Sequence, residues 1–205
     1  MEETMRMQLQ SGIRAMLVHP IKSRVLQRFE TDLKSGRLTT PRRTTANLLD
    51  FCKALSPDHK PDHVDVVPQP WSRMDCCDLN VRKMVADEGG IAVMGYKIWG
   101  LDDYYFEAVP HVVWENPSTC KLEDITFNED GELRILFVSD PRLQSVRQNT
   151  MGDKRRGVYD VVLKEFWSLK SPIEQEIMLK RPGDEELWNK SLTYNVWKKR
   201  HRRKA

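Results

Sequence analysis

Apolar positions along the chain follow a helical spacing at first and an alternating spacing further on. Over residues 20–34 they recur every three or four positions behind a first-turn proline, which predicts an amphipathic helix that Gly36 ends. The same spacing predicts a second helix over residues 44–55. Prolines and aspartates punctuate residues 56–69, so we interpret this stretch as a connector and place a domain boundary in it.

The middle of the chain predicts one helix followed by an antiparallel meander. Asp75 can cap a helix over residues 76–87, and Gly89 with Gly90 can end it. Segments rich in β-branched and aromatic residues, separated by turn residues, then predict strands over residues 91–99, 104–115, 121–127 and 133–138. Further helices are predicted over residues 158–169, 172–179 and 184–200.

These elements predict an α+β fold in which one helix packs on an antiparallel sheet, with helical extensions at both ends. We expect a helical N-terminal extension over residues 1–68, the core over residues 69–140, and a helical C-terminal region with a basic tail over residues 141–205. No apolar run approaches the roughly 18 residues that span a bilayer. The N-terminus also lacks the pattern of a secretory signal, so we expect no membrane contact and a cytoplasmic location.

The segment from Phe106 to Thr126 predicts a hairpin that brings an imidazole to a carboxylate. If Asn116–Thr119 forms the loop, the antiparallel register sets His111 directly opposite Asp124, within the roughly 5 Å at which cross-strand side chains interact. A loop shorter by one residue would instead pair His111 with Glu123. Glu107, on the same strand face as His111, is a further candidate partner for the imidazole.

Cys77 is the candidate nucleophile for this pair. It lies in the first turn of the predicted helix, where the helix dipole and the free N–H groups favour a thiolate and can hold a developing oxyanion. The imidazole would take the proton of the thiol, and the carboxylate would fix the tautomer of the imidazole. Candidates for the oxyanion-binding position or the substrate groove are Gln69, Asn80 and Trp114.

The order of these residues resembles the transglutaminase-like branch of the papain-like cysteine hydrolase superfamily. In that branch a helix-start Cys precedes a strand His followed by an aromatic residue, and then an Asp before Pro or Thr. The matching positions are Cys77, His111 with Trp114, and Asp124 with Thr126.

Residues from about 68 to 140 are also similar to a group of uncharacterised bacterial proteins that share a Cys-x-x-Asn-Val helix and a His-x-x-Trp strand. That spacing favours Cys77 over Cys76 as the nucleophile. The resemblance implies a papain/transglutaminase-like core without a cofactor. It also implies a cysteine-dependent acyl-transfer enzyme (peptidase, deamidase or transglutaminase) that acts on an amide of a protein or peptide.

The same chain contains residues for a metal site and for a binding surface. The soft side chains Cys76, Cys77, His111 and Cys120 lack the spacing of a zinc site, so no metal is predicted. The alternative to an enzyme is a non-catalytic interaction protein that binds nucleic acid or an acidic protein partner through its tail. The candidate contacts are Lys198, Lys199, Arg200, Arg202 and Arg203.

Overall fold

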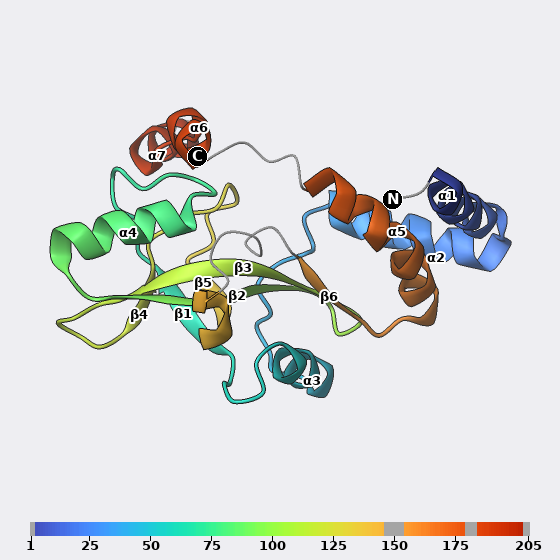
Figure 1. The fold of residues 1–205 in the computed structure, drawn as a ribbon, viewed down its shortest axis with the longest axis horizontal. Coiled ribbons are helices and arrows are strands. Elements are labelled where there is room, and N and C mark those ends of the chain that lie inside the picture. The colour runs from blue at the N-terminus through green and yellow to red at the C-terminus, as the bar shows by residue number, and fades with distance from the viewer. Residues whose placement is uncertain (1–2, 146–153, 179–183, 203–205) are drawn as a thin grey trace.

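Six strands form one mixed sheet at the centre of the computed structural model, which describes residues 3–145, 154–178 and 184–202 (Figure 1). Their order is β2-β5-β1-β4-β3-β6, and the long strands β2 and β3 also pair with each other, which closes the sheet into a small barrel. The strands are β1 (Asp62–Val66), β2 (Ile91–Leu101), β3 (Tyr105–Glu115), β4 (Leu122–Asp124), β5 (Arg134–Ser139) and β6 (Arg155–Val158).

The sheet differs from the predicted antiparallel meander at β1. This strand lies inside residues 56–69, which were predicted to be a connector, and it pairs with β4 in parallel and with β5 antiparallel. The sheet is therefore mixed, and its strands extend from residue 62 to residue 158 rather than over residues 69–140. Val64 of β1 is buried in a small core with Val113, Ile135 and Phe137, which explains why so short a strand is held in place.

Helices surround this sheet, and several match their predicted ranges. The helix predicted over residues 20–34 is present as α2 (Pro20–Lys34), and the one predicted over residues 44–55 begins after an N-cap at Thr45. Where two helices were expected over residues 158–169 and 172–179, the described residues form one helix, Val161–Met178, that continues through Pro172. The remaining helices are α1 (Glu3–Val18), α3 (Ala46–Leu55), α4 (Cys77–Glu88), α5 (Val161–Met178), α6 (Asp184–Lys190) and α7 (Tyr194–Arg202), with a short 3-10 helix η1 (Pro141–Ser145).

Two groups of helices occupy opposite ends of the sheet (Figure 1). α1, α2 and α5 pack on one another and on the end where β2 turns into β3. Their contact is aromatic: the ring of Tyr105 lies 4.8 Å from that of Phe29 and 6.0 Å from that of Trp167. At the other end α4 packs on β2 and β3, and α6 with α7 lies above it.

The main hydrophobic core joins α4 and α3 to the barrel. α4 contributes Val81 and Met84, and α3 contributes Leu48 and Phe51. Burial of this apolar area holds α4 against β3. No helix within the described ranges is both long and apolar enough to cross a membrane.

Candidate active site

Helix α4 begins at Cys77, directly after a turn in which one residue has a left-handed backbone conformation. Asp75, predicted as the helix cap, has φ 60°, and Cys76 takes the N-cap position instead. Among the described residues no side chain accepts a capping hydrogen bond at this end. The first-turn N–H groups next to Cys77 therefore remain available to an anion or an oxyanion.

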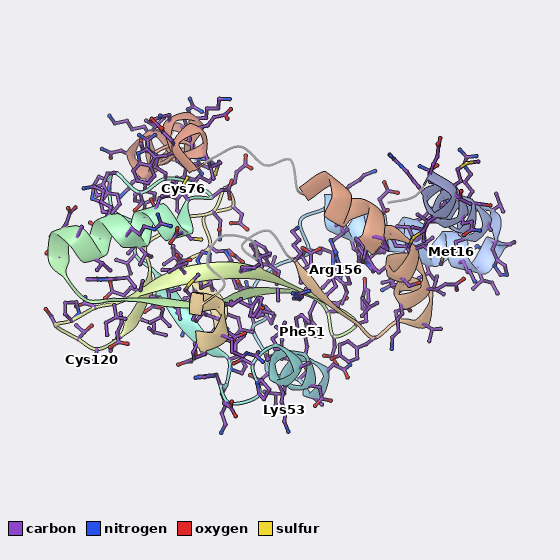
Figure 2. The ribbon with its side chains drawn as sticks, in the orientation of Figure 1. Met16, Phe51, Lys53, Cys76, Cys120 and Arg156 are labelled. Carbon is purple, nitrogen blue, oxygen red and sulfur yellow. The ribbon has the colours of Figure 1, made fainter. Side chains whose placement is uncertain are left out.

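The two adjacent cysteines have different surroundings. The Cys76 side chain is 3% exposed, its Sγ lies 3.5 Å from Ser191 Oγ, and burial raises its pKa. Figure 2 shows it between α4 and the α6–α7 pair. Cys77 is only half-buried and packs against the edge of the main core. Cys77 is thus the better placed of the two for contact with a substrate.

His111 of β3 and Asp124 of β4 form a buried pair. His111 Nε2 lies 3.0 Å from Asp124 Oδ2, as a close ion pair whose angle departs from that of a well-directed hydrogen bond. Asp124 is fully buried and His111 is 8% exposed. Cys77 lies close enough to the same imidazole to affect its pKa. Since Nε2 faces the carboxylate, Nδ1 is the nitrogen left for the thiol.

The charges around the imidazole favour its protonated form. Burial acts to lower the pKa of His111, but the negative charges of Asp124 and Cys77, both close to the ring, outweigh it and raise the pKa to about 10. The ring is therefore an imidazolium at neutral pH.

The predicted hairpin register is wrong, although the predicted pair is present. Trp114 pairs with Glu123 and Glu115 with Leu122, because the turn extends to Lys121, whose carbonyl oxygen accepts from Asn116 N at 2.9 Å. The displacement is even, so Asp124 stays on the expected face and reaches His111 diagonally.

Strand β1, which sequence reasoning missed, holds the carboxylate in place. Asp124 pairs with Val66 in parallel register, and Val67 N donates to the Asp124 carbonyl oxygen at 2.8 Å. Thr126 N donates to Asp124 Oδ1 at 2.9 Å, which leaves Oδ2 for His111.

Two other carboxylates near the hairpin have different partners. Glu107 accepts from Tyr105 Oη at 2.6 Å and lies 3.1 Å from Lys154 Nζ. Glu123 accepts from Asn116 Nδ2 at 2.9 Å. Neither carboxylate takes the place of Asp124.

Two of the three groove candidates are enclosed in the fold. Asn80 is fully buried, and its amide is bound to main-chain groups of Arg73 and to the Thr126 hydroxyl. Trp114 is 4% exposed and donates from Nε1 to Gly89 O at 2.8 Å. The expectation that these two line a substrate groove is corrected accordingly. Gln69 is half-buried, and its side-chain amide makes no hydrogen bond with the part of the chain described here.

The C-terminal region is bound to the loop before Cys77. Tyr194 N donates to Ser72 O at 2.8 Å and Met74 N donates to Leu192 O at 3.0 Å, so residues 192–194 run antiparallel to residues 72–74. This contact divides the helix predicted over residues 184–200 into α6 and α7. It joins segments far apart in sequence, so local spacing gave no signal of it.

The candidate nucleic-acid contacts lie in α7 and directly after it. Lys199 and Arg200 are exposed, while Lys198 is half-buried with its Nζ 5.5 Å from the centre of the Tyr194 ring. Arg203 and the side chain of Arg202 lie outside the described residues.

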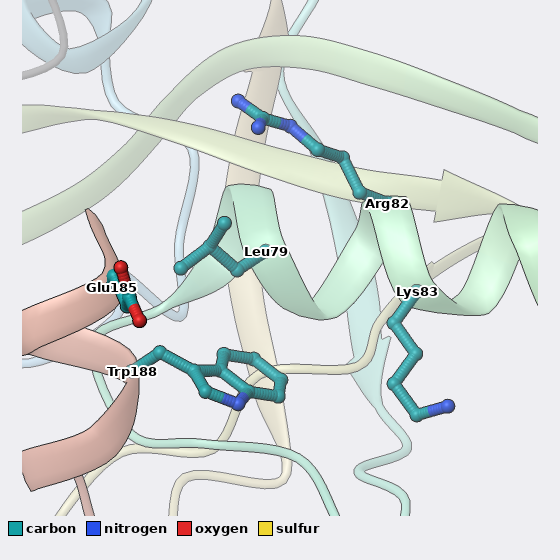
Figure 3. A pocket seen from close by; sticks show the side chains of 5 residues that line it. All are labelled: Leu79, Arg82, Lys83, Glu185 and Trp188. Carbon is teal, nitrogen blue, oxygen red and sulfur yellow. The ribbon is translucent and has the colours of Figure 1, made fainter.

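A cavity of about 360 Å³ lies between α4 and α6. Figure 3 shows Trp188 and Glu185 of α6 facing Leu79 of α4, with Arg82 and Lys83 completing the lining. Cys77 and His111 are not part of that lining. Over the described ranges, no group of three or more His, Cys, Asp or Glu side chains is arranged to hold a metal ion.

Comparison of the chain with protein-family models, with curated proteins and with solved structures finds no significant match.

Proposed function

We propose that this protein is a cysteine-dependent acyl-transfer enzyme that acts on an amide of a protein or peptide. Cys77 is the nucleophile, His111 the general base and acid, and Asp124 the residue that orients the imidazole. The observation that carries the proposal is the buried imidazole: its Nε2 is 3.0 Å from Asp124 Oδ2, and the Cys77 thiol is within reach of the same ring. The fold we propose is papain/transglutaminase-like, because a helix that begins at the thiol packs on a barrel that supplies the imidazole and carboxylate.

The chemistry follows from the geometry. The Cys77 thiolate attacks the carbonyl carbon, and a C–S bond forms as the oxygen becomes an oxyanion beside the first-turn N–H groups of α4. The His111 imidazolium gives its proton to the amide nitrogen, the C–N bond breaks, and a thioester and a free amine result. The neutral imidazole then takes a proton from water or from a second amine, which attacks the thioester. The C–S bond breaks, and the thiolate and the imidazolium are restored.

The protonated imidazole suits the first of these steps. The high pKa of His111, about 10, keeps a proton available for the leaving nitrogen at neutral pH. Asp124 holds the ring so that the proton-bearing edge faces the thiol and the substrate. Peptidase, deamidase and transglutaminase reactions share this acylation step and differ in the leaving and accepting groups.

Selective alkylation tests the proposal, with Cys120 as an internal standard. Cys120 is exposed, whereas Cys52 and Cys76 are buried, so limiting iodoacetamide at pH 6 compares Cys77 with an ordinary surface thiol in the same molecule. We expect Cys77 to react at least about ten times faster than Cys120. His111→Ala should abolish this difference, while the matched control His63→Ala should retain it. Equal rates at Cys77 and Cys120 in the wild-type chain would contradict the proposal.

A second candidate function is binding of nucleic acid or an acidic protein through α7. The observation that favours it is that Lys199 and Arg200 are exposed while Trp197 packs inward, 5.5 Å from Phe127. Replacing Lys199 and Arg200 by Gln should weaken salt-sensitive binding to a short DNA or RNA duplex or to an acidic protein such as α-lactalbumin. No binding of any of these probes by the full chain at low salt would exclude this function.

A further inference from the structure

Asn80 is a fully buried amide that links two segments of the candidate site. Its Oδ1 accepts from Arg73 N at 2.8 Å, and its Nδ2 donates to Arg73 O at 2.8 Å and to Thr126 Oγ1 at 3.0 Å. One planar amide thus acts through its oxygen and through both of its N–H groups. Both donors are used and the side chain is fully enclosed in the fold, so the role of Asn80 lies in what it connects.

The first connection fixes the loop that leads into the nucleophile. Both main-chain groups of Arg73 are bound to Asn80, which lies one turn into the helix that begins at Cys77. The intervening backbone includes Asp75 at φ 60° and Cys76 at the N-cap. Because both ends of this short loop are attached to α4, the path of the backbone at Cys77 is determined relative to the helix.

The second connection leads to the carboxylate. The Thr126 hydroxyl accepts from Asn80, and Thr126 N donates to Asp124 Oδ1 at 2.9 Å. The other oxygen, Oδ2, faces His111 Nε2 at 3.0 Å. Thr126 is 3% exposed and Asp124 fully buried, so water does not compete for these bonds.

We propose that Asn80 is a positioning residue that holds the Cys77 loop and the Asp124 segment in one fixed arrangement, so that the thiol and the carboxylate meet the same imidazole. This inference rests on the proposed function for its consequence in catalysis. An amide is needed because aspartate lacks the two donors and leucine lacks all three hydrogen-bonding groups. Displacements of about 1 Å at a reacting group reduce rates by up to about 100-fold, which makes such a link consequential.

The experiment uses the full-length chain and two matched substitutions of the hydroxyl that Asn80 binds. Thr126→Val removes the acceptor and keeps the shape, while Thr126→Ser keeps the acceptor; both leave the main-chain N–H that donates to Asp124. Asn80→Ala removes the whole link. Each variant is examined by alkylation of Cys77 relative to Cys120, and by NMR titration of the His111 imidazole.

We expect Thr126→Val to slow Cys77 alkylation relative to Cys120 at least about tenfold and to lower the pKa of His111. Thr126→Ser should retain both wild-type values, and Asn80→Ala should show the larger loss. If Asn80→Ala does not fold, the comparison of Val with Ser at Thr126 decides the question. A folded Thr126→Val protein with unchanged His111 titration and unchanged Cys77 alkylation would overturn the inference.

The two readouts separate this inference from the proposed function. If Cys77 of the wild-type chain alkylates no faster than Cys120, the proposed enzyme fails. The His111 titration still reports whether Asn80 and Thr126 position the carboxylate, because it requires no catalysis. A change in that titration in Thr126→Val but not in Thr126→Ser supports the positioning role, and no change in either excludes it.

Discussion

His111 Nε2 lies 3.0 Å from Asp124 Oδ2, although the two residues are not directly opposed in the β3–β4 ladder. The contact is diagonal, and it depends on β1, which pairs with β4 at Val66 and Asp124. The site therefore combines a hairpin that is local in sequence with a strand, β1, that ends at Val66, well before the hairpin begins at Tyr105. The consequences of this pairing are open to measurement.

The stability of the protein should fall as the pH rises above 6.5. The pKa of His111 is about 10 in the folded protein and about 6.5 in an unfolded chain, so the folded state binds the proton more tightly. The stabilisation is complete below pH 6.5 and is lost as the pH rises through the folded pKa. Urea unfolding at pH 6.5, 8 and 9.5 measures this slope.

Asp124→Asn tests whether His111 causes this dependence of stability on pH. It removes the charge that raises the pKa of His111, so the free energy of unfolding should depend less steeply on pH between 6.5 and 9.5. Glu123→Gln, on the same strand but bound to Asn116, should keep the wild-type slope. A slope that is the same in wild type and in Asp124→Asn would show that another group is responsible.

The C-terminal region should protect Cys76 from labelling. Cys76 is 3% exposed beneath Ser191, and burial raises its pKa. Deleting residues 184–205 removes this cover, and we expect iodoacetamide to label Cys76 at least about ten times faster at pH 8. Cys52, whose pKa burial raises to about 12, lies in the core with α3 and should stay unlabelled. Labelling of Cys52 and Cys76 at equal rates would indicate general unfolding instead.

Sequence spacing predicted the elements that carry a regular apolar pattern. The helix Pro20–Lys34 and the strands β2, β3 and β5 were predicted nearly as the structure has them, because their apolar positions repeat with the period of one element. β1 was missed because it is short and follows a Pro-punctuated stretch. β6 was missed because Arg155 and Arg156 give it no apolar alternation.

The candidate site was predicted as a set of residues but not as a geometry. Loop length alone could not give the register, since Cys120 adopts φ 54° and prolongs the turn. An even displacement kept Asp124 on the correct face, so the expected neighbours were found together. The links through Asn80 and Thr126 join residues distant in sequence, and no local pattern encodes them.

Gly95 is the position on β2 opposite His111, and it should not tolerate a side chain. It pairs with His111 on one side and with Ser139 on the other, and an added Cβ would lie 2.1 Å from Val138 O and 2.6 Å from Phe137 Cζ. We expect Gly95→Ala to destabilise the protein by roughly 2–3 kcal/mol, because backbone must move to admit the methyl group.

Gly12→Ala is the matched control. Its Cβ would meet the Leu169 side chain at 3.1 Å, which can adjust, and alanine favours a helix over glycine by about 1 kcal/mol. Chemical denaturation of both variants gives the comparison. Equal stability of Gly95→Ala and wild type would show that β2 and β5 can separate at this point.

A second ion pair joins the buried Lys97 of β2 to Glu132. Lys97 Nζ is 3.2 Å from Glu132 Oε2 and 4.6 Å from the centre of the Trp99 ring, and its side chain is 2% exposed. Glu132 also accepts from Thr40 N and Asn128 Nδ2, each at 2.9 Å. Burial acts to raise the pKa of Glu132, but the charge of Lys97 and the hydrogen bonds from Thr40 and Lys97 outweigh it and lower the pKa.

Removing the carboxylate and removing the ammonium should therefore lower the free energy of unfolding by different amounts. Glu132→Gln leaves the Lys97 ammonium buried without a counter-ion, and we expect a loss of about 3 kcal/mol or more. Lys97→Met leaves a carboxylate that keeps its bonds from Thr40 and Asn128, so its loss should be smaller.

The stabilisation from Glu132 is present above its usual pKa of 4.5 and is lost as the pH falls through the lowered value, so the Lys97→Met protein should show a shallower loss of stability in acid. Urea unfolding at pH 7 and pH 4 of the two variants and of the double variant measures both effects. A larger loss in Lys97→Met than in Glu132→Gln would mean that the lysine, rather than the carboxylate, has the stronger set of partners in the folded protein.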